Sequence, residues 1–148
     1  MASRMDPARA RQLAAALKPG AVLHLLQPLI GKHKFHVLIA ASAERSLGFL
    51  INSRIGPFIQ NRPDLLSRQV SLPVAANPFM HHDSIIACHD TVRLPPLGEL
   101  IAGLADRSMS LVGYLHHDLL VIIAAAAAGS PLIAARDAEL IATGFAVR

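Results

Sequence analysis

The stretch AVLHLLQPLIGKHKFHVLIAASAERSLGFLI, residues 21–51, holds three short apolar runs separated by polar or glycine-containing breaks. The runs cover residues 21–26, 36–41 and 47–51. Their lengths are typical of β-strands and short for helices. This stretch therefore predicts three consecutive strands near the beginning of the chain.

Further strands are expected on the C-terminal side of this stretch. Residues 69–74 alternate between apolar and polar side chains, and Pro73 places them at a sheet edge or a strand end because proline cannot donate to a ladder. Residues 84–88 and 91–94 complete about six strands. Such short spacing favours a small, closed or nearly closed barrel over βαβ units.

Helices are predicted at both ends of the chain. Asp6-Pro7 is a typical helix start, and the first helix should run to Leu17. After residue 94 the apolar residues recur at the helical spacing of residues 97, 100, 101 and 104, and two more helices should cover 116–128 and the region from Ser130-Pro131 to about Gly144. The expected fold is α+β in one domain of 148 residues: an N-terminal helix (1–18), a barrel (19–94) and a helical C-terminal part (95–148).

Composition excludes several classes of protein. With 53% hydrophobic and 16% charged residues, the chain is not a long disordered segment, and its one cysteine, Cys88, excludes a disulfide scaffold and favours the cytoplasm. The apolar residues 119–135 are interrupted at Gly129, so no membrane span or membrane partner is expected. Residues 1–18 are interpreted as a surface helix, with a mitochondrial presequence as the alternative. The net charge of +4 permits a nucleic-acid partner.

Several segments, in this order, resemble the PemK/MazF family of toxin ribonucleases over residues 18–129. Lys18-Pro-Gly-Ala-Val-Leu is similar to the family's opening x-P-G-D-I-V strand, and HVLIAAS (36–42) stands where the family has an RPALVLS-like run. LGFLINS (47–53) occupies the place of the strand that ends in T-S. Asp83-Ser-Ile-Ile-Ala-Cys is similar to the D-S-x-V-x-C signature. TVRL (91–94) and GYLHHDLL (113–120) are similar to the I-R-T-L strand and the G-x-L-S-x-E-x-L helix.

This resemblance implies an SH3-like barrel, a homodimer, metal-independent cleavage of single-stranded RNA without a cofactor, and neutralisation by a cognate antitoxin protein. The chain departs from the family at two places. The Arg-Pro pair before the second strand is replaced by the stretch from Lys34 to Val37, and the threonine at the end of the next strand corresponds to Asn52 or Ser53. The alternative is therefore a non-catalytic SH3-like binding module that has lost the nuclease activity.

Cleavage of RNA by its own 2′-hydroxyl needs a base, an acid and a cation, and His33-Lys34-Phe35-His36 offers imidazoles and an ammonium. Alternation along a strand puts Lys34 and His36 on one face and His33 on the other. The hypothesis gives proton transfer to His36, phosphate stabilisation to Lys34 and a hydrogen bond to phosphate to Ser53, the three expected catalytic residues. The expected RNA contacts are His33, Asn52, Arg54 and His82. A solvated basic loop without catalysis is the alternative.

Three other groups are given structural roles. Asp83 and Ser84 are expected to cap backbone N–H groups at a turn. A metal site is the alternative, but adjacent histidines such as His81 and His82 point to opposite faces of an extended chain and do not close one. No metal is therefore expected. Asp118, which follows two histidines, is interpreted as helix-start chemistry, and Cys88 as a core residue. The long connection 54–68 is either a partner-binding loop or a short surface helix, and the apolar helix 116–128 is a candidate dimer interface.

Overall fold

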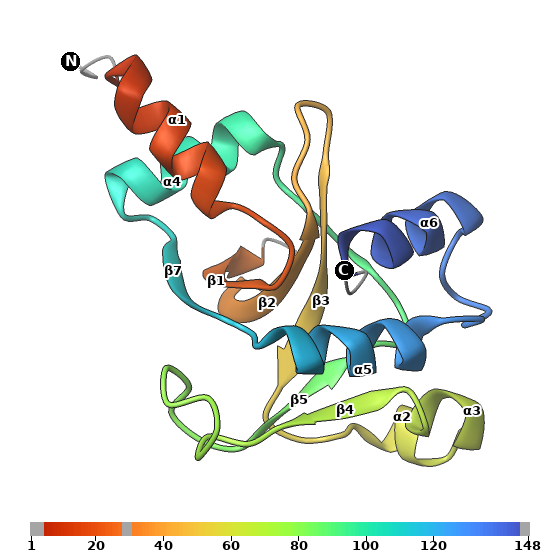
Figure 1. The fold of residues 1–148 in the computed structure, drawn as a ribbon. Coiled ribbons are helices and arrows are strands. Elements are labelled where there is room, and N and C mark those ends of the chain that lie inside the picture. Colours follow the sequence, from red (N-terminus) through yellow and green to blue (C-terminus); the bar gives the residue numbers. More distant parts are fainter. Residues whose placement is uncertain (1–4, 28–30, 146–148) are drawn as a thin grey trace.

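A computed structural model describes residues 5–27 and 31–145 and shows an α+β protein. An N-terminal helix precedes a curled antiparallel sheet, and helices cover both faces of that sheet (Figure 1). The strands are β1 (Ala21–Gln27), β2 (Lys32–Ala40), β3 (Ser46–Asn52), β4 (Gln69–Leu72), β5 (Ser84–Ala87), β6 (Val92–Leu94) and β7 (Ser110–Tyr114). The helices are α1 (Pro7–Ala16), α2 (Pro57–Gln60), α3 (Pro63–Leu66), α4 (Leu97–Asp106), α5 (His117–Ala127) and α6 (Ala135–Gly144).

The strand order is β4-β5-β3-β2-β1-β7, and β6 adds to β3 beside β5. Every pair in this sheet is antiparallel. The sheet is therefore a half-barrel with β4 and β7 at its two ends, and within the part of the chain that the structure describes these two strands do not pair to close a barrel.

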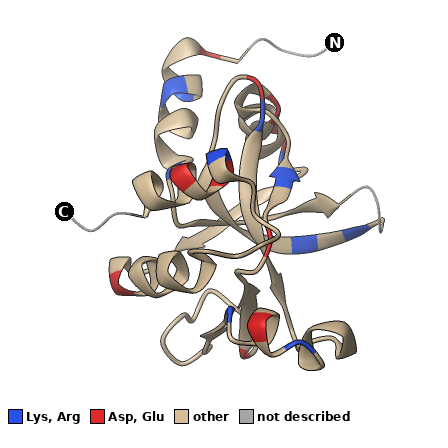
Figure 2. Ribbon diagram, turned by 90° about the vertical axis from the view of Figure 1, so that its right-hand side faces the viewer, with Lys and Arg blue, Asp and Glu red and all other residues tan. Residues whose placement is uncertain are grey.

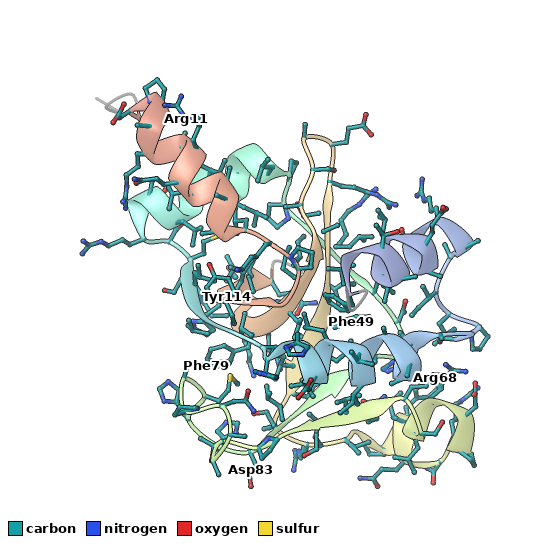
Figure 3. All side chains as sticks on the ribbon, viewed as in Figure 1. Arg11, Phe49, Arg68, Phe79, Asp83 and Tyr114 are labelled. Carbon is teal, nitrogen blue, oxygen red and sulfur yellow. The ribbon has the colours of Figure 1, made fainter. Side chains whose placement is uncertain are left out.

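Each face of the sheet has its own apolar core, which explains why 53% of the chain is hydrophobic. On one face, Phe49 of β3 lies with its ring centroid 6.4 Å from that of Phe145, beneath α5 and α6 (Figure 3). On the other face, Leu23 and Leu38 pack with Leu100 of α4. The helix α1 has no buried residue of its own and lies against α4.

The predicted strands agree with the observed ones to within a few residues, and two differences concern the C-terminal half. Residues 110–114 form β7, a strand inserted between α4 and α5, although strands were expected to precede all the C-terminal helices. This strand has no strong apolar alternation of its own. It forms by pairing with β1, where Gly113 lies opposite Val22. The last helix begins at Ala135, because residues 131–133 turn first.

The edge position of β4 was correctly predicted, since this strand pairs with β5 and ends at Leu72, just before Pro73. The connection 54–68 contains the two short helices α2 and α3, and Leu65 of α3 is buried. Phe58, by contrast, is 60% exposed. The connection is therefore helical, as two short helices instead of one, and of its apolar residues Leu65 packs inward whereas Phe58 and Leu66 stay exposed.

The register of β1, β2 and β3 positions the residues of interest. Leu23 lies opposite His36, which lies opposite Leu50, and Leu25 lies opposite Lys34. Because cross-strand partners point to the same face, Lys34 and His36 share the face that α4 partly covers. This agrees with the alternation expected from the sequence.

Candidate functional site: a cationic pocket beside the β5–β6 turn

A pocket of about 750 Å³ opens where β2 and β3 face the turn between β5 and β6. The turn lies here because β3 pairs with β6 at residues 46–48 and with β5 at residues 51–52, leaving residues 88–91 free to bend away. We call this the cationic pocket. It is lined by Lys32, Lys34, Leu50, Asn52, Ser53, Arg54, Gly56, Pro57, Ile59, Ala87, His89, Asp90, Thr91 and Val92.

The charged lining residues are three cations and one carboxylate. Lys32 and Lys34 point to the same side of β2 because they are two residues apart, and Arg54 follows the end of β3. In Figure 2, β2 carries basic residues and no acidic residue. Within the described residues, none of these three cations forms an ion pair, so their charge is available to an anion. Asp90 is the one acidic lining residue.

Four of the residues singled out from the sequence meet in this pocket: Lys34, Asn52, Ser53 and Arg54. They come from the beginning of β2 and the end of β3, which the antiparallel register brings side by side. Ser53 and Arg54 are exposed, whereas Lys34 and Asn52 are half-buried. Two cations and two neutral hydrogen-bonding groups on one concave surface can hold the oxygens of a phosphate.

His89 is a lining residue that sequence reasoning did not select. Its Nδ1 lies 2.9 Å from Nε2 of Gln69, which also donates to the carbonyl of Leu65 at 3.0 Å. The amide therefore donates to Nδ1, and the neutral ring carries its proton on Nε2. Ser130 Oγ donates to the His89 carbonyl and fixes the backbone at the turn. The available signal was the short apolar run of residues 85–88, which ends just before His89.

Burial lowers the pKa of His89, and the carboxylate of Asp90 opposes this shift. A neutral imidazole with its proton on Nε2 is a hydrogen-bond donor. It can bind a phosphate oxygen through this N–H. Nε2 can accept a proton only after the ring changes tautomer, so that Nδ1 carries the proton and the hydrogen bond from Gln69 is lost.

His36 lies outside the cationic pocket and lines a second one, although it shares a sheet face with Lys34. Its side chain is 1% exposed. Nδ1 lies 3.2 Å from the Lys34 carbonyl, to which it donates, and Nε2 has no hydrogen-bond partner among the described residues. Burial lowers the pKa of His36 to about 4, an effect only partly opposed by the Lys34 carbonyl. This placement argues against proton transfer by His36 to a phosphate held at Lys34.

The two remaining RNA-contact candidates also lie elsewhere. His33 points to the opposite face of β2, where its ring centroid is 5.4 Å from that of His24. His82 lies in the loop before β5, with Nδ1 2.9 Å from the carbonyl of Asp83. Neither residue lines the cationic pocket.

Asp83 and Ser84 hold this same loop together. The Asp83 carboxylate accepts the backbone N–H of Val74 at 2.9 Å, so it ties the loop to the end of β4. Ser84 Oγ donates to the His82 carbonyl at 3.2 Å and is buried. Asp83 thus caps a backbone N–H, whereas Ser84 donates to a carbonyl and not to the N–H cap that was expected, and both contacts hold the turn.

Within the described residues, one group of side chains has the spacing of metal ligands: His116, His117 and Asp118 at the start of α5. All three are exposed, and His116 accepts the N–H of Asp118 as the N-cap of the helix. Cys88 is fully buried, and burial raises the pKa of its thiol. It is therefore a core residue with neither the exposure nor the ionisation of a ligand or nucleophile.

The helices of the described chain are all too short or too polar to cross a membrane. No protein-family model matches the chain, and no curated sequence matches it.

Proposed function

We propose that the chain binds single-stranded RNA through its phosphate backbone at the cationic pocket. One observation carries this proposal, namely that three cations, which form no ion pair with the described residues, and several neutral hydrogen-bonding groups line one concave surface. Lys34 and Arg54 supply charge, and Asn52 and Ser53 supply hydrogen bonds to phosphate oxygens. Each neutralised phosphate releases counterions, so binding should weaken as salt rises.

Single-stranded RNA fits this pocket better than a duplex does. Lys34 and Asn52 are half-buried in a concave surface, so a phosphate must enter the pocket to reach them. A flexible single strand can bend its backbone inward, whereas the phosphates of a duplex lie on a stiff helix.

Cleavage of the bound strand, as in a toxin-like endoribonuclease, is the second candidate function, and His89 is the observation that favours it. In this reaction the 2′-oxygen forms a bond to phosphorus while the bond from phosphorus to the 5′-oxygen breaks. A base takes the 2′-hydroxyl proton, an acid protonates the leaving 5′-oxygen, and Lys34 and Arg54 stabilise the added negative charge. No metal enters this scheme.

The hydrogen bonds of His89 favour binding over cleavage. To serve as the base, His89 would have to move its proton from Nε2 to Nδ1 against the donating amide of Gln69. The buried His36 cannot replace it. The binding module is accordingly the leading proposal.

The architecture and partners implied by the family resemblance belong to the same proposal. We propose that the half-barrel is an SH3-like sheet, that the protein is cytoplasmic, and that it forms a homodimer. A cognate antitoxin would then compete with RNA for the cationic pocket. An acidic antitoxin segment would suit the three cations of this pocket.

Incubation of the purified protein with a long single-stranded RNA in EDTA tests both candidates. Retarded migration of intact RNA, lost in Lys34→Ala, is the result expected for a binding module. Cleavage to 2′,3′-cyclic phosphate ends, lost in His89→Ala and retained in His36→Ala, would instead establish the ribonuclease. Absence of both binding and cleavage would refute the proposal.

A further inference from the structure

The second pocket has a volume of about 280 Å³ and lies between the curled β1–β2 pair and the segment that leads from β6 to α4. We call it the His36 pocket. Its walls are mainly apolar, and they consist of Leu25, Leu26, Gln27, His36 and residues 92–96. One water molecule occupies about 30 Å³ in the liquid, so this pocket is large enough to admit a small aromatic ring.

Two polar atoms at this pocket lack a hydrogen-bond partner among the described residues: Nε2 of His36 and Oε1 of Gln27. Because Nδ1 of His36 donates to the Lys34 carbonyl, Nε2 carries a lone pair and acts as an acceptor. Oε1 of Gln27 is an acceptor as well. Both atoms are buried, and buried polar atoms without partners are uncommon in folded proteins.

The two pockets adjoin one another. Val92 lines both of them, and His36 of the second pocket lies opposite Leu50 of the cationic pocket in the β2–β3 register. A nucleotide with its phosphate at Lys34 therefore has a neighbouring apolar pocket into which its base can turn. Lys34 and His36, both in β2, would then belong to the phosphate half and the base half of one nucleotide site.

We propose that the His36 pocket holds a guanine base of the RNA whose phosphate occupies the cationic pocket. This inference rests on the proposed function. The apolar walls, including Pro95 and Pro96, suit a flat ring, and the two acceptors call for two N–H donors. Guanine carries two donor nitrogens side by side, N1 and the 2-amino nitrogen, whereas adenine, cytosine and uracil each carry a single donor nitrogen on their base-pairing edge.

Binding of short RNAs tests this assignment. A uridine decamer with one central guanosine should bind about tenfold more tightly than the same decamer with adenosine or cytidine. Inosine, which lacks the 2-amino group, should fall between them. His36→Leu and Gln27→Leu should each bring the affinities for the guanosine and adenosine decamers close together. Lys34→Ala should weaken both to a similar extent, and Arg11→Ala on α1 should change neither.

Guanosine, which has no phosphate, tests the pocket independently of the backbone contacts. Its addition to the ¹⁵N-labelled protein should shift the His36 Nε2 resonance, and inosine should shift it less. If the RNAs fail to bind but guanosine shifts this resonance, the proposed function fails and the guanine pocket stands. If guanosine leaves the resonance unchanged and the decamers bind equally, the guanine pocket is wrong, even where binding of RNA is strong.

Discussion

Lys34 and His36 are two residues apart on one face of β2, yet their surroundings give them opposite chemistry. Lys34 opens into a pocket rich in cations and polar groups, and His36 is enclosed by aliphatic side chains. Burial disfavours the charged imidazolium, so His36 stays neutral where a free histidine would titrate. Strand alternation assigns a residue to a face, and the covering elements decide how much water reaches it.

The enclosed His36 predicts acid sensitivity of the fold. Its pKa in the folded protein is about 4, below the ordinary value of 6.5. Between these pH values the unfolded chain binds the proton and the folded chain does not, so the free energy of unfolding falls as pH decreases through this window. The loss due to His36 should reach about 3 kcal/mol by pH 4.

Urea denaturation of the wild type and of His36→Leu between pH 4 and pH 7 measures this loss. The variant should lose less stability on acidification, and what remains should come from other groups, such as His24 and His89, whose pKa values burial also lowers. Equal losses in both proteins would mean that the folded structure does not lower the pKa of His36.

Sequence reasoning found the cations and neutral groups of the candidate site, because Lys34, Asn52, Ser53 and Arg54 lie at the ends of strands with clear apolar runs. It did not find His89, which reaches the pocket only because a turn leaves β3 between its pairings with β5 and β6. Non-local pairing of this kind leaves no local pattern in the sequence. The burial of His36 likewise depends on residues 92–96, which lie far along the chain.

At the scale of elements, the well-predicted strands carry their own apolar runs, and β7 does not. All five residues of β7 are half-buried or exposed, and the four that follow Ser110 do not alternate between apolar and polar side chains. Its formation depends on the free edge of β1. The start of α6 was placed too early because Ser130-Pro131 has the appearance of a helix start, whereas Ser130 donates to the His89 carbonyl instead.

Arg68 joins the β4 side of the sheet to the end of α5, and its replacement tests how much that junction stabilises the fold. Its Nη1 donates to the carbonyls of Ala126 and Ala128, at 3.0 and 2.6 Å, where the α5 carbonyls lack helical partners (Figure 3). Arg68→Lys keeps the charge but loses the planar guanidinium that donates to both carbonyls, so the free energy of unfolding should fall by about 1–2 kcal/mol.

Urea denaturation of Arg68→Lys should be compared with that of Arg62→Lys, the same substitution beside the exposed ring of Phe58. The control should change stability by less than about 0.5 kcal/mol. Equal effects of the two substitutions would show that Arg68 contributes no more than a surface arginine.

Gly48 allows β6 to pack against β3, and adding a methyl group there should weaken the junction beside both pockets. A Cβ at residue 48 would lie 2.7 Å from Cδ1 of Leu94 and 2.9 Å from the Val37 carbonyl oxygen. Gly48→Ala should therefore lower the free energy of unfolding by about 1–3 kcal/mol. Gly98→Ala in α4 meets no atom within 4 Å and should instead be neutral or raise stability by up to about 1 kcal/mol. Thermal melts that rank the two variants in the opposite order would contradict this packing.

At the scale of the whole molecule, α5 packs one side against the sheet and leaves apolar residues on the other. Val121 and Ile122 are 42% and 53% exposed, whereas Ile123 is fully buried. The proposed homodimer predicts that this outer side of α5 forms the interface. Sedimentation should then give a dimer for the wild type and a monomer for Ile122→Glu, with an unchanged circular dichroism spectrum. A wild-type monomer at high protein concentration would refute the dimer, and a dimeric Ile122→Glu would move the interface elsewhere.

RNA recognition at the cationic pocket is tested by the salt dependence of binding to a fluorescent single-stranded uridine RNA in EDTA. For the wild type, the logarithm of the association constant should fall linearly with the logarithm of salt concentration. Lys34→Ala and Arg54→Ala should each weaken binding and reduce the slope by about 0.7, the value for one phosphate contact on a single strand. Arg11→Ala should match the wild type. Binding that is absent, or equally strong and equally salt-dependent in all four proteins, would contradict RNA recognition at the cationic pocket.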